Sequence, residues 1–487
     1  MAKYKHGIYV NEVPTKMPVP TYATSGIQVI FGTAPVNQAS DPYNVTNKPI
    51  LVTSMDDAKD QLGYSEDFDS YTLCQSMYAS FAVSRVAPIV LINVLDPTKH
   101  VKTVADEDIS VSNRIAKFPH TGMLLDQLTV KTGEGAEMKE GTDYVATLED
   151  DGTVSIGLTS TGAGATQSTI KVGGTAIDPS AVKASDIVGG TDGDGKRSGI
   201  ACIKDVYPMC QVIPATMLAP GFSSKAEVGV ALTSAAREIN GVFRSFVCLD
   251  IDSSTTTKYT EVAAAKKSNG YASCDSVVLW PEVTIGSENR QVAFSAALAA
   301  GMQALDAANG DCPTRTPSNV DIGITGCVLH DGTEINLDFE QANGLNAEGI
   351  MTACRAEGWK TWGPQTAAYP DETDVKDIVI GIRRMSSWHA NSFIVRYLER
   401  LDQNISHRAI EALVADENVR CNALTAQDKW AGGRIEYRES ENPLADVLAG
   451  QVHFYQYITP YPAMKEIYNT LEYSADILAA NLAGGEA

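Results

Sequence analysis

Three features are missing from this sequence, and each absence narrows the function. None of the nine cysteines forms a C-x-x-C pair, so they are expected to be free thiols in a reducing cytosol. No run of about 18 apolar residues could span a bilayer, and the first residues have no apolar signal core. Positive charge is scarce, because 38 Lys and Arg stand against 60 Asp and Glu, a net charge of −22. Such a chain repels phosphates, so we expect no nucleic acid partner and no membrane insertion.

The motifs of common enzymes are also missing. There is no H-E-x-x-H, no G-x-S-x-G and no G-x-G-x-x-G after an expected strand. Residues 190–197, GTDGDGKR, begin like a phosphate loop, but Arg197 replaces the Ser or Thr that would reach magnesium. The same stretch lacks the Glu that ends a calcium loop, since Ile203 holds that position. We interpret it as a flexible loop at a domain boundary and expect no catalytic residue, no cofactor and no metal.

Alternating apolar and polar segments predict an α/β fold. The 487 residues suggest about three domains at roughly 100–200 residues each. Strand-like and helical stretches alternate over 25–97 and again over 200–345, which is typical of parallel strands covered by helices on both faces. Residues 98–199 hold short alternating segments and the hairpin signal Asp151-Gly152. The predicted class is α/β, a doubly wound core with an inserted β-rich domain, followed by a C-terminal α+β domain over 346–459.

Individual elements follow from the same periodicities. The core is expected to contain strands over 25–34, 89–94, 212–218, 246–251 and 277–280. Its expected helices cover 53–62, 72–86, 224–240, 257–268 and 288–308. In the last third of the chain, the sequence predicts a helix over 348–357, a strand over 377–382, one long helix over 387–415, a short helix over 425–430 and a strand over 435–438.

Both ends of the chain carry strand-like stretches that prolines separate from the body. The N-terminal arm, 1–24, contains YKHGIYVNEV followed by three prolines, and the C-terminal arm, 460–487, begins PYP. Proline removes backbone donors and so disfavours continuation of the same sheet ladder. The C-terminal arm alternates like a strand at 467–473, although the apolar residues 464, 467, 471 and 478 could equally form a helical stripe. Two such ends predict pairing with something outside the monomer.

One local excess of positive charge stands out. Five arginines lie within 26 residues against two acidic residues, a local charge of +3 (5 minus 2). Pairing with acidic neighbours in the same subunit explains them as well as a docking face for an acidic partner does. The five are Arg383, Arg384, Arg396, Arg400 and Arg408.

Several stretches, taken in order, resemble tail sheath proteins of contractile phages and phage-tail-like bacteriocins. They are HGIYVNEV, GGTDGDGKRSGIACIKDVYPMCQVIPATMLAPGFSS, INGVFRSFVCLDID, TPSN, IGIRRMSSW and VHFYQYITPYPAMKEI. The resemblance covers nearly the whole chain and is weakest in the inserted β-rich domain. It implies a structural protein without enzymatic activity or cofactor, polymerised as stacked hexameric rings around a tail tube and contracting to drive that tube through the target cell envelope.

The resemblance also implies partners and places. The partners are other copies of the chain, the tail tube protein, and baseplate and tail terminator proteins. The protein would be made in the bacterial host cytoplasm and assembled in a virion or bacteriocin tail. Two alternatives stay open: a cytosolic α/β enzyme with a β-domain lid and a ligand pocket at the carboxyl ends of the core strands, and a non-contracting fibre or shell protein that uses the same arms.

In the resembled family the terminal arms cross to neighbouring subunits and complete a sheet there, which is strand addition. The corresponding arm residues in this sequence are Gly7, Ile8, Tyr9, Val10, Val13, Ile467, Leu471 and Tyr473. The corresponding receiving sheet contains Val452, Phe454, Gln456 and Ile458. Family sheaths dock on the tube through the C-terminal domain, so the five arginines become candidate tube contacts.

Overall fold

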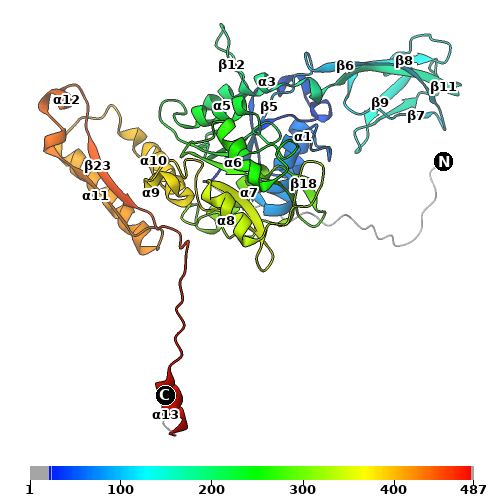
Figure 1. Ribbon diagram of the computed structural model, residues 1–487. Helices are drawn as coiled ribbons and strands as arrows, with labels where there is room; N and C mark the ends of the chain where they lie inside the picture. Colours follow the sequence, from blue (N-terminus) through cyan, green and yellow to red (C-terminus); the bar gives the residue numbers. More distant parts are fainter. Residues whose placement is uncertain (1–20, 23–24, 484–487) are drawn as a thin grey trace, which may run out of the picture.

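The computed structural model describes residues 21–22 and 25–483. Figure 1 shows a central α/β body, a β-rich unit that projects from one side of it, and a helical unit with a β-hairpin on the opposite side. The chain leaves this last unit as an extended tail that ends in α13 (Ala475–Leu482). The predicted arm residues Gly7, Ile8, Tyr9, Val10 and Val13 lie outside the described residues.

An eight-stranded sheet forms the centre of the body, in the order β21-β20-β16-β15-β14-β2-β5-β3. The six strands from β20 to β5 run parallel, and the two edge strands are antiparallel to their neighbours. Every residue of β2, β5, β14, β15 and β16 is buried, as expected for strands covered on both faces. In sheet order the strands are Trp359–Trp362, Ile350–Arg355, Ser276–Leu279, Phe246–Asp250, Thr216–Leu218, Gln28–Gly32, Ile89–Asn93 and Pro49–Val52.

Helices connect and cover these strands. Ser54 caps the first of them, since its hydroxyl accepts a hydrogen bond from the Asp57 amide at 3.1 Å. α2 continues into a π-helical segment over Tyr78–Ser84. The helices of the body are α1 (Met55–Leu62), α2 (Leu73–Met77), α3 (Ala184–Val188), α4 (Ile203–Cys210), α5 (Ala226–Ala236), α6 (Tyr259–Ser268), α7 (Phe294–Ala308) and α8 (Phe339–Ala347). None of the helices described is long and apolar enough to cross a membrane.

One predicted helix of the body and one predicted helix of the C-terminal domain are wrong in extent or type. The helix expected over 288–308 begins at Phe294, because β18 (Arg290–Val292) pairs with β17 (Glu282–Ile285), which also pairs with β19 (Ile324–Val328). The helix expected over 348–357 is instead the core strand β20. Its residues Ile350 to Cys354 are buried on both faces, so tertiary burial decides between two periodicities that a short apolar run cannot separate.

The projecting unit consists of two three-stranded sheets with their own core. One sheet has the order β6-β11-β8 and the other β7-β10-β9, and side chains such as Phe118, Ile156 and Val172 pack between them. The Asp151-Gly152 hairpin signal is confirmed, because β9 pairs with β10 and Gly152 has a φ of +79°. The strands β6 to β11 are Val101–Ser110, Ile115–Phe118, Met123–Thr132, Tyr144–Leu148, Val154–Leu158 and Thr169–Ile177.

The sheets of this unit stop before the predicted boundary at 199. Ala184 and Ile187 of α3 already pack in the main core. The stretch that resembles a phosphate loop is the turn of a small hairpin between β12 (Gly190–Thr191) and β13 (Arg197–Ser198). Inside it, the carboxylate of Asp192 accepts the amides of Asp194 at 3.0 Å and Lys196 at 2.8 Å, where a phosphate loop would bind its ligand. The domain boundaries themselves stay predictions.

The C-terminal unit differs most from expectation. Residues 377–382 form no strand but parts of α9 (Val375–Ile378) and α10 (Ile380–Tyr397). The single helix expected over 387–415 is divided: α10 ends at Tyr397, and α11 (His407–Ala426) starts afresh where the Ser406 hydroxyl accepts the Ala409 amide at 3.2 Å. No separate helix covers 425–430, since α11 reaches Ala426. β22 (Gly432–Tyr437), α12 (Leu444–Leu448) and β23 (Phe454–Thr459) follow.

Candidate functional site: the C-terminal hairpin and tail

The expected receiving strand forms a two-stranded antiparallel hairpin with β22. Ile435 lies opposite Gln456 in its register. Gly433 allows the hairpin to approach the buried indole of Trp430, because a Cβ at this position would lie 2.7 Å from the ring. β23 begins at Phe454 rather than at 451, since the Asn442 side chain binds the amide and the carbonyl of His453 at 2.7 and 2.9 Å and closes the loop there. Val452 therefore precedes the strand.

The predicted alternation of β23 is present. Phe454, Gln456 and Ile458 are half-buried on the face toward α11, while Tyr455 and Tyr457 are exposed. On the exposed face the guanidinium of Arg438 lies 3.7 Å from the Tyr455 ring centre, and that of Arg434 lies 4.5 Å from the Tyr457 ring centre. The hairpin thus has an apolar inner face and an outer face of tyrosine and arginine.

A buried carboxylate fixes the inner face. Glu417 of α11 is fully buried and accepts hydrogen bonds from Gln456 at 3.0 Å, Arg420 at 3.1 Å and Tyr397 at 3.0 Å. His389 of α10 lies 3.4 Å from the same carboxylate, and burial, followed by the charge of Arg420, lowers the pKa of His389. Sequence reasoning missed Glu417, because a glutamate in the middle of a polar helix normally lies on a solvated face.

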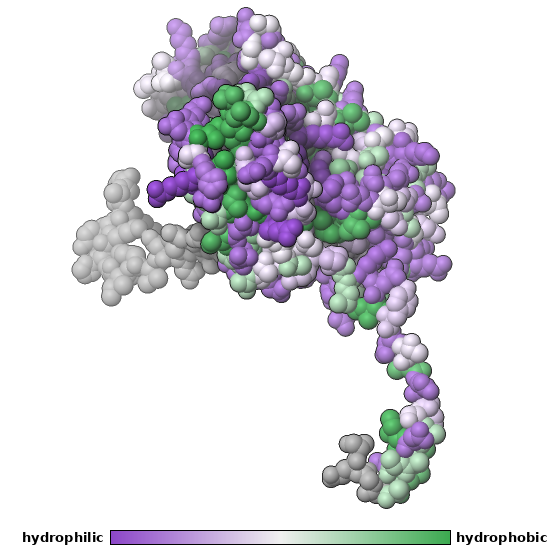
Figure 2. Space-filling view, turned by 90° about the vertical axis from the view of Figure 1, so that its left-hand side faces the viewer, coloured by the Kyte–Doolittle hydropathy of each residue, from purple (hydrophilic) through white to green (hydrophobic). Residues whose placement is uncertain are grey.

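The tail beyond the hairpin is extended and exposed. Residues 460–474 contain no helix and no strand, which decides against the helical stripe for this part of the tail. The predicted arm residues Ile467, Leu471 and Tyr473 are 79%, 88% and 80% exposed. Figure 2 shows the tail hanging free below the body and hydrophobic side chains gathered in a stripe over the C-terminal unit. Apolar side chains this exposed in one subunit need a partner.

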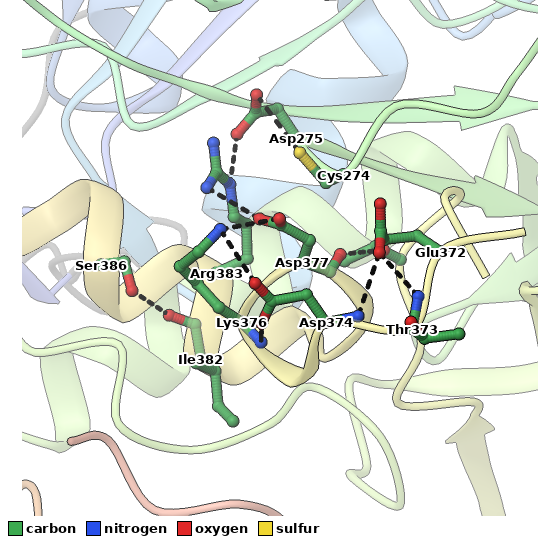
Figure 3. Close-up of polar contacts among 11 residues, drawn as sticks. Cys274, Asp275, Glu372, Thr373, Asp374, Lys376, Asp377, Ile382, Arg383 and Ser386 are labelled. Atoms are coloured by element: carbon green, nitrogen blue, oxygen red, sulfur yellow. Dashed lines mark hydrogen bonds and ion pairs between the residues drawn. The ribbon is translucent and has the colours of Figure 1, made fainter. Parts of the chain in front are cut away.

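The structure separates the five arginines. Arg383 lies between Asp275 and Asp377, with contacts of 2.6 and 3.1 Å (Figure 3). The side chain of Arg384 is 4% exposed and forms an ion pair with buried Asp306. The charge of Arg384 is therefore enclosed and neutralised within the subunit, and a tube contact through this residue stays a prediction.

The other three arginines belong to separate helical segments. Arg396 near the end of α10 binds the two carboxylate oxygens of Asp416 at 3.0 and 2.9 Å. Pairing within the subunit therefore explains three of the five. Arg400 at the end of a 3-10 turn (Leu398–Arg400) and Arg408 in α11 are exposed. They keep the predicted role as candidate contacts.

One cavity of the body does not lie where the enzyme alternative placed its ligand. This cavity of about 400 Å³ is lined by Ala215 and Phe246, which precede or begin two core strands, and by Arg244, Arg384 and Asn391. It therefore lies at the amino ends of these strands. At the carboxyl end of β15, Asp250 is buried and binds Ser223 at 2.7 Å and Ser295 at 2.5 Å. Among the described residues no cluster of His, Cys, Asp and Glu could hold a metal.

Comparisons with known proteins confirm the resemblance seen in the sequence. The chain is 25% identical over 483 residues to the tail sheath protein of Burkholderia phage BcepMu, covering 96% of this chain and 97% of that protein. It is 24% identical over 291 residues to the tail sheath protein of Escherichia phage P2, covering 58% and 69%. No family model matches.

Solved structures share the fold. A chain of the anti-feeding prophage baseplate matches with a TM-score of 0.60 and 12% identity, over 97% of this chain and 100% of that chain. A chain of the contracted sheath complex of an extracellular contractile injection system, PVC, matches with a TM-score of 0.54 and 13% identity, over 98% and 99%. The mixed α/β architecture described above is thus that of known contractile assemblies.

Proposed function

We propose that this protein is the subunit of a contractile tail sheath, which polymerises as stacked hexameric rings around a tail tube. The observation that carries the proposal is the exposed tail: Ile467, Leu471 and Tyr473 have no cover in the subunit, and they follow directly on a hairpin of only two strands. A pair of strands alone is marginal in water, so added strands would stabilise both the hairpin and the tail. The similarity to the tail sheath protein of Burkholderia phage BcepMu over 96% of this chain supports the same function.

Contraction would use the body as a rigid unit and the tails as links. The continuous core of the body supports movement as one piece, and the prolines at 460 and 462 place a stiff joint between β23 and the tail. Rotation of such units between two lattices changes the contacts between subunits while the exchanged strands keep them connected. The driving free energy would come from lattice contacts that are better satisfied after contraction, without nucleotide hydrolysis.

The proposed partners follow from the same arrangement. Other copies of the chain would take up the tails, and the tube protein would contact the C-terminal unit at Arg400 and Arg408. Baseplate and terminator proteins would close the two ends of the sheath. The N-terminal residues Gly7 to Val13 would form the second link between subunits.

Electron microscopy of the purified full-length protein tests the proposal. Tubes or stacked rings are expected from the full chain, and they should disappear both from a variant lacking residues 1–20 and from one lacking residues 464–487. Each variant retains the complete body, so circular dichroism and thermal unfolding serve as controls for folding. Discrete small oligomers in all three samples would contradict the sheath hypothesis and favour the enzyme alternative. Fibres that never shorten would favour the non-contracting fibre or shell protein.

A further inference from the structure

The C-terminal unit is joined to the body through α10. In the first half of this helix, Arg383 and Arg384 form ion pairs with Asp275 and Asp306 of the body. One turn farther along, His389 faces α11. Figure 1 shows α10 beside the body and α11 with β23 farther out. His389 therefore lies at the junction between the body and the hairpin.

α11 and the hairpin form one piece. The side-chain amide of Asn418 in α11 donates to the carbonyl of Ile435 in β22 at 3.0 Å and accepts the Ile435 amide at 3.0 Å. Gln456 of β23 donates to Glu417 of α11 at 3.0 Å. Polar contacts thus attach both strands to α11, so a separation of α11 from α10 moves the hairpin as well.

The apolar core of this junction is small. Among the described residues, it has four buried members, in contrast to the large cluster of the body: Cys312, Met385, Cys421 and Trp430. The ring of His389 lies against this cluster, 5.1 Å from the ring of Trp430 between centres. Segments with few buried apolar contacts open at a lower free energy than the rest of a protein. One additional buried charge can therefore decide whether the junction stays closed.

His389 is buried without a hydrogen bond. The residue is 3% exposed, and in the described part of the chain neither ring nitrogen has a hydrogen-bond partner. Its Nε2 atom lies 3.4 Å from the carboxylate of Glu417. Burial and then the charge of Arg420 lower the pKa of His389, although Glu417 acts in the opposite direction. The ring is therefore neutral in the folded subunit at neutral pH.

Protonation of the ring would make two cations compete for one carboxylate. At neutral pH the charge of Glu417 is balanced by Arg420 at 3.1 Å, and Tyr397 donates a further hydrogen bond at 3.0 Å. An imidazolium at His389 would add a positive charge that has no counter-ion of its own among the described residues. A buried charge without a partner is costly, so protonation destabilises the closed junction.

The titratable groups on the other sides of the ring are neutral or positive. Burial raises the pKa of the Cys312 and Cys421 thiols and of the Tyr397 phenol, so all three are neutral. Lys429, which directly precedes Trp430, is itself a cation. None of these groups compensates a second positive charge.

The neighbouring carboxylates are already paired. Asp416 of α11 binds the guanidinium of Arg396 through both of its oxygens, at 3.0 and 2.9 Å. On the body side, buried Asp306 is paired with Arg384. A protonated His389 could gain either carboxylate only by breaking an existing ion pair.

We propose that His389 makes this junction sensitive to acid: when its ring takes up a proton, α11 and the hairpin separate from α10 while the body stays folded. Below roughly pH 6.5, the opened form binds a proton that the closed form does not. The equilibrium constant for opening therefore rises about ten-fold for each pH unit, until the closed form also titrates. The property belongs to the single subunit and goes beyond the proposed sheath function.

Hydrogen exchange followed by mass spectrometry measures this opening. The sample is the full-length chain, kept below the concentration at which it assembles. After correction for the intrinsic pH dependence of exchange, peptides of α11 and the hairpin are expected to lose protection roughly ten-fold from pH 7 to pH 5.5. Peptides of the core strands should keep their protection.

Two histidine variants assign the effect. His389→Phe keeps a ring of similar shape but cannot titrate, so its C-terminal unit is expected to show the same protection at both pH values. His407→Gln is the matched control, because His407 is exposed on α11 and contacts only the exposed Glu411 among described ionisable groups. This control should keep the ten-fold change of the wild type.

Arg420→Met tests the competition for Glu417. Without the guanidinium, the carboxylate of Glu417 is left for the imidazolium, and protonation of His389 then closes the junction. The pH dependence should therefore reverse, with protection of α11 lost as the pH rises from 5.5 to 7. A role of His389 in packing alone predicts no reversal.

The remaining outcomes would overturn the proposal. They are an equal loss of protection in the wild type and His389→Phe, a loss spread over the core strands, or an unchanged acid response in Arg420→Met. If His389→Phe does not fold, His389→Gln replaces it, since this side chain is also neutral at both pH values. No assembled particle is needed, so the result is independent of whether the chain forms a sheath.

Discussion

The carboxylate of Glu417, which is fully buried, accepts a hydrogen bond from the side-chain amide of the half-buried Gln456 at 3.0 Å. This contact joins β23 to α11. The hairpin is therefore held in place by a polar network before any strand is added to it. A receiving site that is already formed in the free subunit reduces the ordering entropy that assembly must overcome.

Glu417→Ala should destabilise the C-terminal unit. The substitution leaves the largely buried guanidinium of Arg420 and the amide of Gln456 without their acceptor. Breaking a buried charge pair from one side costs about 3–5 kcal/mol, and we expect a fall of roughly this size in the free energy of unfolding, measured with urea. Glu411→Ala on the same helix is the control, since the only ion pair it makes with a described residue is an exposed contact with His407; it should change stability by less than about 0.5 kcal/mol.

Equal effects of these two substitutions would show that the Glu417 network does not stabilise the unit. The assembly of both variants can be compared in the same samples. A Glu417→Ala protein that is less stable but assembles normally would mean that the hairpin does not have to be preformed.

Much of this site was predictable from β23 alone. Bulky side chains on both faces of a short run, followed by two prolines, indicate a strand that ends abruptly, and the structure has Phe454, Gln456 and Ile458 on one face as expected. The residues that hold the strand were not predictable. Glu417 and Asn418 lie about 40 residues earlier in a helix whose polar pattern carries no sign of burial, and only the tertiary arrangement brings them beneath the hairpin.

The arginines illustrate the same difficulty. A count of charges along the sequence treats Arg383 and Arg384 as part of a basic surface, yet their partners Asp275 and Asp306 lie 108 and 78 residues away. The break between α10 and α11 also could not be predicted from the sequence, because the residues between Tyr397 and Ser406 keep enough helical character to hide it. Local patterns report periodicity, while burial of charge depends on distant partners.

Gly433→Ala should destabilise the hairpin, whereas Gly432→Ala should not. A Cβ at Gly433 would lie 2.7 Å from the ring of Trp430, which is fully buried and cannot move freely, while a Cβ at Gly432 meets nothing within 4 Å. Overpacking typically costs about 1–3 kcal/mol. The free energy of unfolding of both variants, with tryptophan fluorescence as the signal, provides the comparison. A similar loss for both would mean that backbone freedom, rather than the contact with Trp430, explains the glycine pair.

Arg384→Met should destabilise the protein. Adding Asp306→Leu to this variant should restore part of the lost stability. The ion pair joins α10 to α7 in the interior, where both side chains are almost completely buried. Removing the guanidinium leaves a buried carboxylate and costs about 3–5 kcal/mol, while replacing both partners by apolar residues is often close to neutral. A double-mutant cycle measures the coupling. Additive losses would contradict a direct interaction between the two residues.

Asp250 should make stability depend on pH between about 4 and 6. Burial raises the pKa of this carboxyl to about 6, against roughly 3.9 in an unfolded chain. In that range the folded state binds more protons than the unfolded state, so the contribution of Asp250 is present at low pH and is lost as the pH rises through 6. Relative to Asp250→Asn, which cannot titrate, the wild type should lose roughly 2 kcal/mol of stability from pH 4 to pH 7. A constant difference between the two proteins would show that Asp250 stays ionised in the fold.

Arg400 and Arg408 should contribute to binding of the tube, unlike the paired arginines around them. They are exposed, and no ion pair with a described residue neutralises either of them. In a chain of −22, they present local positive charge to an acidic partner. We expect Arg400→Glu with Arg408→Glu to weaken co-sedimentation of assembled sheath with its tube, and the defect should be larger at low salt because exposed charges are screened.

Arg114→Glu with Lys117→Glu provides the matched control. It reverses two exposed charges on the projecting β-rich unit and changes the net charge of the chain by the same amount. If only net charge mattered, both double variants would bind the tube equally poorly, and a tube contact at Arg400 and Arg408 would be rejected. If only the first pair fails, the contact surface lies at the end of α10 and the start of α11. The two arginines that the fold leaves unpaired would then be the part of the original cluster that serves assembly.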